Sequence, residues 1–416
     1  MLSLVVAVCV AADPVARSEA PAGAITAQPP GGPVRVLGAR PEVPAGELLT
    51  LLPGTSVKTL NAAVVLTCRA DPTGQSPVPV LETAFVLGTA ADADAVVTLD
   101  RGRLDLLNAK KEGSATVVVR LHQFTWTLTL DRPGSRVAVE LAGRRPAGTR
   151  FAPDAPPVEP VLSAVVVGLS GTGSVSDGRT TVAVSAPPGP AQLNWTSTNG
   201  PDRQALRLDR LPAWANPNAD QTTEAKAVRA AAERFRGLRV ANADTATDVL
   251  LSSNQPAEWR VGLVAAAAAD DLPRMSRMLV ESADPAVWDF GVIVFRHWLG
   301  RGPGQDRRLF QFLTDTRKYD PVSAATVIDL LAGFSPVERN RAETYDILVE
   351  YLQHDKPAVR NLAQWHLVRM VPAGKAIPFR PNAGKDEQTA AYKEWRKLIP
   401  AGMLPPARAK EAAGKP

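Results

Sequence analysis

Residues 95–142 read AVVTLDRGRLDLLNAKKEGSATVVVRLHQFTWTLTLDRPGSRVAVELA, and this stretch decides the fold of the first half of the chain. Within it, residues 124–130 alternate large apolar side chains with threonines. Successive side chains of a β-strand point to opposite faces of the sheet, so this alternation puts all the large groups on one face. The sequence therefore predicts a strand over 124–130 with one buried face, on which Trp126 is a core residue.

A turn and a returning strand follow directly. Residues 132–135 read RPGS, with proline where a tight turn needs a fixed φ and glycine where a type II turn needs a positive φ. Residues 136–141 then alternate polar or small side chains with apolar ones. The pattern predicts a meander of antiparallel strands with one buried face.

Short apolar runs separated by turn residues extend from residue 47 to about residue 195. Turn signals such as DPTG at 71–74 and SDG at 176–178 recur at short intervals. This spacing is typical of an all-β sandwich, roll or barrel. DRG at 100–102 is expected to be one of these turns. The expected strands are Leu48–Leu52, Ala63–Cys68, Val80–Leu87, Val96–Leu99, Arg103–Leu107, Thr116–Leu121, Phe124–Leu130, Arg136–Leu141, Leu162–Leu169, Thr180–Ser185 and Ala191–Trp195.

The second half carries an internal repeat. Pro285, Pro321 and Pro357 stand 36 residues apart, and a degenerate earlier copy begins at Pro256. Each of the three opens a segment with apolar or small residues six, ten and thirteen positions later, which is the spacing of one helix face. Proline is tolerated in the first turn of a helix, where its missing N–H costs least. The three sets are Gly291, Val327 and Ala363; Phe295, Leu331 and Leu367; and Trp298, Phe334 and Met370.

Another amphipathic segment precedes each of these helices, over residues 272–280, 308–316 and 344–352. Paired helices at a period of 36 resemble HEAT-like repeats, in which stacked neighbours bury a continuous core. A basic helix over Asp386–Leu398 is expected to cap the stack. The predicted fold class is multidomain, all-β followed by all-α, with an antiparallel β sandwich or roll ahead of a HEAT-like α-helical repeat domain.

The segments LDRGRLDL at 99–106, TVVVRL at 116–121 and GSRVAV at 134–139 resemble the β-domain of the FecR family. That family places a strand, an RG turn and another strand before a strand of the form G-t-x-v-x-v. A later pair, Leu162–Leu169 and Thr180–Ser185, also resembles the family. With its helical C-terminal part, the chain resembles planctomycete-type extracytoplasmic FecR domain-containing proteins. The cytoplasmic helical region and membrane span of FecR regulators have no counterpart here, so the resemblance implies the envelope-facing module.

Composition suggests how the chain is divided. Residues 1–12 are expected to be a signal peptide, and truncation is one explanation for the lack of a basic residue before its short apolar run. That run is far shorter than the ~20 residues of a spanning helix. The halves are expected to fold independently, with a boundary between Gly200 and Thr222. The expected parts are a flexible Pro/Ala-rich leader at 13–45, the FecR-like β-domain at 46–200, a linker at 201–221, the α-repeat domain at 222–400 and a disordered basic tail at 401–416.

The basic residues are concentrated at one end. Residues 356–416 hold 12 Lys/Arg against 4 Asp/Glu, whereas the whole chain has a net charge of only +5. A nucleic-acid-binding surface over the whole protein is therefore not expected. Lys393, Arg396 and Lys397 are candidates for a surface that faces an anionic partner or envelope surface, and a solvated capping helix is the alternative reading.

No motif carries the spacing of a catalytic or metal site. Residues 289–291 spell DFG inside a repeat helix without the other kinase motifs, and are interpreted as chance. Asp92 and Asp94 could ligate calcium, but the spacing of a calcium loop is missing. Cys68 lies in an apolar run and is expected to be a buried small hydrophobe. The histidines lack metal-ligand spacing and are expected to be packed or half-exposed: His122, His297, His354 and His366.

These features predict a non-enzymatic scaffold or protein-binding module of the cell envelope, periplasmic or secreted. We expect a protein partner, no nucleic acid, no transmembrane span, no metal and no cofactor. One alternative is a FecR-like signal-transduction component that acts with a separate membrane or sigma-factor partner. Another is an enzyme of a type that the sequence does not reveal.

Overall fold

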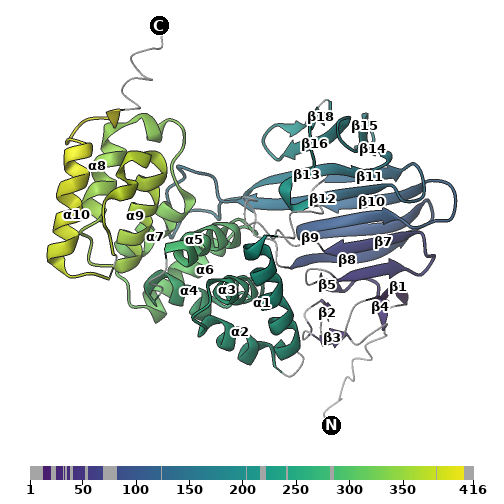
Figure 1. The fold of residues 1–416 in the computed structure, drawn as a ribbon, viewed down its shortest axis with the longest axis horizontal. Coiled ribbons are helices and arrows are strands. Elements are labelled where there is room, and N and C mark those ends of the chain that lie inside the picture. Colours follow the sequence, from purple (N-terminus) through teal and green to yellow (C-terminus); the bar gives the residue numbers. More distant parts are fainter. Residues whose placement is uncertain are drawn as a thin grey trace, which may run out of the picture. The chain divides into compact units, whose positions relative to one another are not determined.

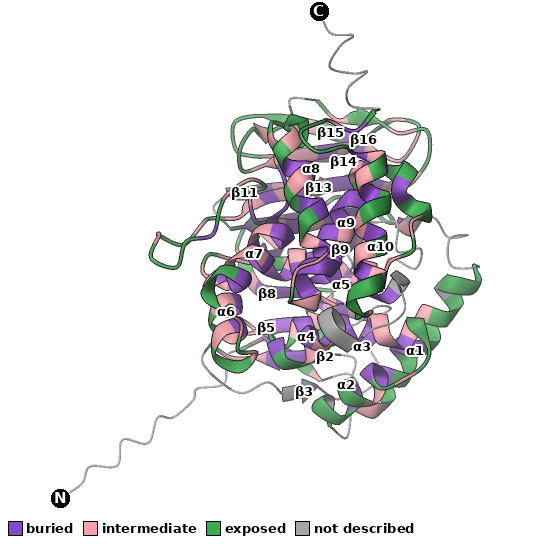
Figure 2. Ribbon diagram, turned by 90° about the vertical axis from the view of Figure 1, so that its left-hand side faces the viewer, coloured by how far each residue is buried: buried purple, intermediate pink, exposed green. Residues whose placement is uncertain are grey.

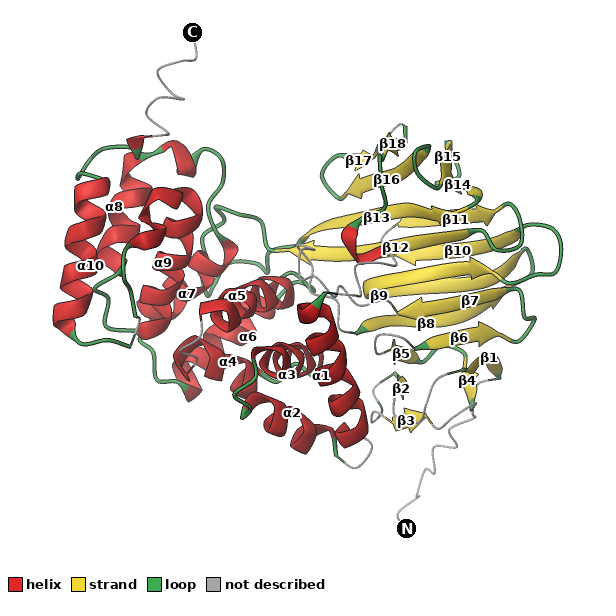
Figure 3. Ribbon diagram, viewed as in Figure 1, coloured by secondary structure: helices red, strands yellow, loops and turns green. Residues whose placement is uncertain are grey.

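The computed structural model describes residues 13–406, except 20–24, 31, 33–34, 38–40, 52–54, 69–81, 123, 203, 216–221, 240–241, 282–284 and 381. A large mixed β-sheet occupies the N-terminal part and helices the C-terminal part, as Figures 1 and 3 show. The predicted all-β plus all-α arrangement is thus confirmed at this level. Contacts divide the chain into two compact units. The β unit is Met1–Ala142 with Leu162–Leu250, and the helical unit is Gly143–Val161 with Leu251–Pro416.

Two ladders of strands share the long strand β9. The first half of β9 pairs antiparallel with β8 and parallel with β10, and its ladder extends to β3 and β15. The second half of β9 pairs antiparallel with β7 and β12, and β7 leads on to β6, β1 and β4. The strands are β1 (Pro14–Ser18), β2 (Ile25–Gln28), β3 (Arg35–Leu37), β4 (Glu42–Pro44), β5 (Leu48–Leu51), β6 (Ser56–Thr59), β7 (Val64–Cys68), β8 (Thr83–Ala90), β9 (Ala93–Asn108), β10 (Ala115–Leu121), β11 (Phe124–Leu130), β12 (Arg136–Arg144), β13 (Val161–Ser170), β14 (Thr172–Ser176), β15 (Thr181–Ser185), β16 (Pro190–Thr196), β17 (Gly200–Pro201) and β18 (Leu206–Arg207).

Residues 100–102, which were expected to form a turn, are part of strand β9 instead. The strand continues through these residues, and its partner changes from β8 at Arg101 to β12 at Gly102. Gly102 has φ +92°, and a Cβ there would lie 2.8 Å from Thr83 Oγ1. Glycine therefore permits both the backbone conformation and the close approach. The RG dipeptide marks a strand that passes from one ladder to the other, not a hairpin.

Strand β11 spans Phe124–Leu130 as predicted, and Trp126 is buried at 1% exposure. Phe124 adds an edge contact to Trp126, with ring centroids 5.2 Å apart. The predicted meander differs in one respect, because β11 pairs with β10 and β14 whereas β12 pairs with β9. The turn at 132–135 therefore joins two ladders. Alternation within a strand fixes the buried face but not the neighbour in the sheet.

Residues 13–45, expected as a flexible leader, form strands where the structure describes them. Strands β1 to β4 lie here, and Ala16, Ile25 and Val43 belong to the same buried apolar cluster as the rest of the sheet. The composition of this segment did not indicate strands, because each strand is short. Proline is tolerated at strand ends, where Pro14 and Pro44 stand. Residues 1–12 lie outside the described residues, so the signal peptide stays a prediction.

Part of the segment expected as a linker covers the sheet. Arg103 of β9 is fully buried, and its Nε and Nη2 lie 2.8 and 2.5 Å from Glu140 Oε2 on β12. Trp214, in the short helix η1 (Ala213–Ala215), lies over this arginine, with its ring centre 3.8 Å from Cζ. A buried charge is tolerated when it is paired and stacked in this way. The described part of 201–221 therefore contributes packing to the β unit through Trp214.

The helix expected to begin the repeat domain is tied to the β unit. Helix α1 (Thr223–Arg239) ends in Arg239, whose Nη1 is 2.9 Å from the carboxylate of Glu82, with both side chains largely buried. Its Nη2 donates to Thr26 Oγ1 at 3.4 Å. Helix α2 (Ala243–Leu251) follows, and the division between the units falls at Leu250. Whether the two parts fold independently stays a prediction.

In the helical unit each proline of the predicted series opens a helix. Helix α5 contacts α3 and α7, and α7 contacts α9, so the four proline-led helices follow one another in space. Asp320 caps α7 by accepting a hydrogen bond from the Ser323 N–H at 2.9 Å. The elements are α3 (Pro256–Ala268), α4 (Leu272–Glu281), α5 (Pro285–Leu299), α6 (Gln305–Gln311), η3 (Phe312–Thr316), α7 (Pro321–Ala332), η4 (Glu338–Asn340), α8 (Ala342–Tyr351), α9 (Pro357–Met370), η5 (Pro372–Ala376) and α10 (Lys385–Leu398).

The predicted core positions of these helices are partly confirmed. Phe295, Leu331 and Leu367 are all fully buried, as expected for equivalent positions. The next set is less regular, because Phe334 lies beyond the end of α7 and Met370 is only half-buried. Helix α10 occupies the range expected for a capping helix, and Figure 2 shows its broad exposed face in green.

The connection between β12 and β13 belongs to the helical unit, and Gly143–Val161 is termed the arm below. Arg145 of the arm pairs with Asp306 of α6 at 3.1 Å, and both side chains are almost wholly buried. The ring of Phe151 lies 5.0 Å from that of Phe310. A Cβ at Gly300 would collide with the arm backbone, so glycine is needed there. The helical unit is therefore completed by a segment from the middle of the β sequence.

Candidate functional site

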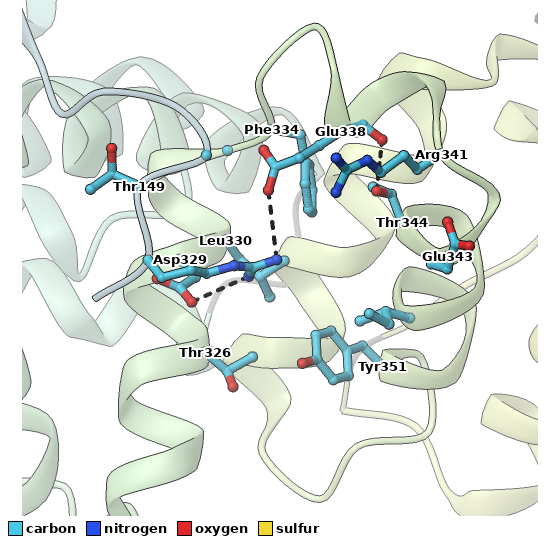
Figure 4. Close-up of a pocket in the computed structure, with 14 residues that line it drawn as sticks. Thr149, Thr326, Asp329, Leu330, Phe334, Glu338, Arg341, Glu343, Thr344 and Tyr351 are labelled. Carbon is cyan, nitrogen blue, oxygen red and sulfur yellow. Dashed lines mark hydrogen bonds and ion pairs between the residues drawn. The ribbon is translucent and has the colours of Figure 1, made fainter. Parts of the chain in front are cut away.

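A pocket of about 430 Å³ lies in the helical unit, where the arm meets α7 and α8 (Figure 4). The arm supplies one wall, and α7 from Thr326 onward with the turn after it supplies a second. The third wall is α8, from its N-cap Arg341 to its last residue Tyr351. The lining residues are Gly148, Thr149, Arg150, Thr326, Asp329, Leu330, Gly333, Phe334, Glu338, Arg341, Glu343, Thr344, Ile347 and Tyr351.

The guanidinium group of Arg150 bridges two carboxylates of this pocket. Its nitrogens lie 3.3 Å from Asp329 Oδ2 and 3.6 Å from Glu338 Oε1, and Figure 4 marks both pairs with dashed lines. Asp329 also accepts a 2.7 Å hydrogen bond from the Phe151 N–H. The carboxylates are mostly buried, so these partners offset their loss of hydration. Arg150 itself is 65% exposed. The interior charges are therefore already compensated, and they attach the arm to α7.

Local sequence holds Glu338 in place. Residues 335–338 read SPVE and form a capping box. The N–H and Oγ of Ser335 donate to Glu338 Oε2 at 2.8 and 2.9 Å, and the Glu338 N–H donates to Ser335 Oγ at 3.3 Å. Gly148 has φ +79°, and a Cβ there would stand 2.6 Å from the same Oε2. Glycine is therefore required at this position for the arm to approach the carboxylate.

The rim carries the groups that face solvent. Figure 4 shows Arg341, Glu343 and Tyr351 on the α8 side of the pocket, across from Thr326 and Asp329. Arg341, Glu343 and Ile347 are exposed, and Ile347 leaves 44% of its surface in contact with water. An apolar side chain flanked by both charge signs is suited to binding a protein segment.

Arg396, one of the three cations predicted to face an anionic partner, has a different role. Its side chain is only 17% exposed and lies 2.5 Å from Asp346 and 2.8 Å from Glu350, both on α8. Burial lowers the pKa of Arg396, but the hydrogen bonds to Glu350 and Asp346 raise it above its ordinary value on balance. Arg396 therefore clamps α10 to α8, and the expectation that it is exposed is wrong.

Lys393 and Lys397, the other two, are exposed on one face of α10. That face also carries Asp386 and Glu394, and Glu394 pairs with Lys397 at 2.6 Å. Alternating signs at helical spacing give little net field. The structure thus separates the three predicted residues into two exposed lysines of a mixed-charge face and one structural arginine.

The histidines lie apart from one another. His366 of α9 is buried with Nε2 2.7 Å from the Leu330 carbonyl oxygen, and burial lowers its pKa to about 3. His354 accepts a 3.0 Å hydrogen bond at Nδ1 from the Lys356 N–H. His122 is exposed in a turn, and His297 is half-buried in α5. In the part of the chain that the structure describes, no group of three or more His, Cys, Asp or Glu residues could hold a metal ion.

Two further residues considered for chemistry have structural contacts. Asp94 accepts a 2.8 Å hydrogen bond from the Thr116 N–H and pairs with Lys110 at 2.8 Å. Cys68 is fully buried with its Sγ 3.2 Å from Thr83 Oγ1, and burial raises the pKa of its thiol to about 12. A protonated buried thiol is a poor nucleophile. Asp92 is exposed, and the DFG at 289–291 lies inside α5.

Sequence reasoning missed the residues that build the pocket. The capping box at 335–338 was a readable signal, because Ser and Glu three residues apart mark a helix start. Nothing in the local sequence of Arg150 indicates that it reaches Asp329 and Glu338, which lie 179 and 188 positions further on. Only the position of the arm in the helical unit brings these side chains together.

No family model matches this chain, and no curated protein matches it. Over the residues that the structure covers, none of the helices is long and apolar enough to cross a membrane.

Proposed function

We propose that this chain is a non-enzymatic scaffold of the cell envelope that binds a protein partner through its helical unit. The proposal includes a FecR-like β-domain and HEAT-like helical repeats. The succession of proline-led helices α3, α5, α7 and α9 supports the repeat assignment, because stacked helix pairs pack mainly against their neighbours. Such stacks commonly present extended binding surfaces.

One observation carries the binding proposal, namely the contrast between the interior and the rim of the pocket. The interior carboxylates Asp329 and Glu338 are engaged by Arg150. The rim keeps an exposed isoleucine between charged groups. An exposed isoleucine beside a pocket offers apolar surface that a partner can bury, and arginine and tyrosine are frequent in the energetic centres of interfaces.

The partner proposed is a protein segment that inserts an apolar side chain against Ile347 and Tyr351. A carboxylate of that segment would pair with Arg341, and a basic group would pair with Glu343. A volume of about 430 Å³ falls within the range of small binding pockets, which suits one or two side chains rather than a whole element. The flanking contacts would then lie on the exposed surface of α8.

The test is comparative capture from envelope extract with quantitative mass spectrometry. The wild-type chain is expected to retain a specific protein that Ile347→Asp loses by roughly tenfold or more, since an unpaired charge would face the inserted side chain. Val322→Asp is the matched control, because Val322 is an equally apolar, 75% exposed residue of α7 outside the pocket.

Three results would count against the proposal. One is capture of the same proteins by wild type and Ile347→Asp. Another is equal loss in Ile347→Asp and Val322→Asp, which would indicate a general effect of surface charge. The third is recovery of the chain only from the cytosolic fraction of its own cells, which would remove the envelope assignment.

A further inference from the structure

Two arginines of the helical unit lie over the ring of Trp365 in α9, and two more lie near Arg296, one of this pair. Arg369 lies over the Trp365 ring, with its Cζ 4.0 Å from the ring centre, and Arg296 of α5 lies 5.4 Å from the same centre. The other two, Arg144 of the arm and Arg339 of η4, are exposed. The backbone of Arg144 packs against Gly300 after α5, and Arg339 donates to Phe334, whose ring lies 4.9 Å from that of His366. Four separate segments of the chain thus place arginines in one region of the helical unit.

Arg296 is the central member and has no counter-charge. Among the described residues its guanidinium group makes no hydrogen bond and no ion pair, only the contact with Trp365. A Cβ at Gly333 would lie 2.9 Å from its Nη1, so the group packs closely on that backbone. Burial, followed by repulsion from the other three arginines, lowers the pKa of Arg296 to about 10. A cation kept in such surroundings is destabilised unless an anion joins it.

Nearby acidic groups do not balance the cluster. Asp289 pairs with Arg369 at 3.4 Å, and it is the one carboxylate paired with any of the four arginines among the described residues. Arg339 donates from Nε to the Phe334 carbonyl oxygen at 3.0 Å, which leaves its terminal nitrogens available. Trp365 is 9% exposed, and its buried Nε1 has no hydrogen-bond partner in the described part of the chain. An unused donor and surplus positive charge therefore occur together.

We propose that this cluster is a binding site for a soluble phosphate-class oxyanion, held by Arg144, Arg296, Arg339 and Arg369 with the indole N–H of Trp365. Guanidinium groups match phosphate and carboxylate oxygens with paired N–H donors. The surplus of positive charge favours a doubly charged phosphate over a single carboxylate. Arg296 and Trp365 are recessed, which favours a small anion over a flat lipid surface. The site adjoins the protein-binding pocket at Gly333 and Phe334, but none of its five binding residues lines that pocket.

The experiment measures binding of inorganic phosphate to the full chain by calorimetry and by thermal melting at constant ionic strength. Sodium acetate and sodium chloride are the comparison salts. Arg296→Gln and Arg369→Gln each remove one cation of the cluster. Arg308→Gln is the matched control, because Arg308 also lies over a tryptophan, 5.6 Å from the Trp298 ring centre, but is paired with Asp270 at 3.4 Å.

Phosphate is expected to bind the wild type and to raise its melting temperature more than acetate or chloride. Each cluster variant should weaken binding by roughly tenfold or more, as loss of a charge-assisted hydrogen bond does. Arg308→Gln should bind as the wild type does. Without phosphate, Arg296→Gln should melt at or above the wild-type temperature, because it removes an uncompensated cation. A purely structural arginine would give the opposite result.

Several results would overturn the proposal. Two such results are failure of phosphate to stabilise the wild type beyond chloride and equal stabilisation by acetate. Equal loss of binding in Arg308→Gln and Arg296→Gln would show a nonspecific charge effect. Co-sedimentation with phosphatidylglycerol vesicles that depends on Arg296, without any effect of inorganic phosphate, would replace the soluble anion by a lipid surface. Should Arg296→Gln fail to fold, Arg369→Gln decides alone, because that residue is partly exposed.

Discussion

The β unit and the helical unit build their cores in different ways. In the β unit, one apolar cluster collects residues from Ala16 to Leu193, and β9 links its two ladders. In the helical unit, each proline-led helix packs on the next, so most contacts join neighbours in sequence. Exceptions among the described residues include the contact of α4 with α9 and the arm, which comes from the middle of the β sequence. The comparison teaches that the all-α part is not a contiguous segment of this chain.

Because of this difference, a single cut in the chain does not separate the β unit from the helical unit. A fragment that begins near Thr222 would carry α1, whose Arg239 pairs with Glu82 of the β unit. The same fragment would lack the arm and its buried Arg145. We therefore expect a cut between residues 200 and 222 to leave each fragment with unpaired buried groups, which is costly.

The largest expected effect comes from placing a charged side chain in the core of the helical unit, which should unfold that unit and leave the β unit folded. Leu331 of α7 is fully buried, so Leu331→Asp should bury an unpaired carboxylate and unfold the helical unit, at a cost on the order of 5 kcal/mol. Circular dichroism should lose most of its helical signal, with α1 and α2 of the β unit left, while protease-resistant β fragments remain. Val322→Asp, on the same helix but exposed, is the control. Comparable melting of the two variants would contradict the predicted core.

The next effect concerns the β core. Trp126→Ala should cost about 3–5 kcal/mol, because it empties a large volume between well-packed side chains. Thr125→Ala, on the exposed side of the same strand, should change stability by no more than about 0.5 kcal/mol. Urea unfolding monitored by hydrogen exchange in β10 and β11 measures both. A Trp126→Ala protein as stable as its parent would show that the alternation was misread.

A pH effect should appear in the helical unit. The pKa of His366 is lowered from 6.5 to about 3 by burial, so between these values the unfolded chain binds a proton that the folded chain does not. Stability should therefore fall as the pH drops below about 6.5, with a slope approaching about 1.4 kcal/mol per pH unit. His366→Gln, which can still donate to the Leu330 carbonyl, should lose this slope. Parallel pH profiles of the melting temperature for the two proteins would contradict the neutral buried imidazole.

The smallest effects distinguish two neighbours on α10. Arg396→Ala should cost about 1–2 kcal/mol, because its charge-assisted hydrogen bonds to Asp346 and Glu350 are partly buried. Lys397→Ala should stay within about 0.5 kcal/mol, since its pair with Glu394 is exposed. Thermal unfolding of both variants checks the difference. Equal costs would mean that α10 is not clamped through Arg396.

Periodicity predicted much of the fold because it reports which face of an element is buried. The seven-residue alternation fixed the bounds of β11, and the spaced prolines fixed the starts of α3, α5, α7 and α9. The partners of each strand in the sheet were harder to predict, because pairing depends on segments far apart in the chain. The break expected at 100–102 shows this limit, since glycine serves equally in a turn and in a strand that changes partner.

The residues of the candidate site could not be predicted from local sequence for a related reason. Lys393, Arg396 and Lys397 were singled out by charge density, which does not reveal whether a carboxylate such as Glu350 is already paired with one of them. The pocket depends on the arm, and no pattern within residues 143–161 indicates helices as its packing partner. Long-range contacts of this kind require the fold itself.

Hydrogen exchange of the full chain carrying Asp306→Asn tests most directly whether the arm is part of the helical unit. The substitution removes the charge that pairs with buried Arg145, and Asp315→Asn, an exposed aspartate of η3, is the control. We expect faster exchange at the amides of Gly148 and Phe151, which donate to Gly333 and Asp329, together with α6 and α7. Exchange in β10 and β11 should not change. Unchanged protection of the arm and α7, or faster exchange in β10 and β11 instead, would contradict the account.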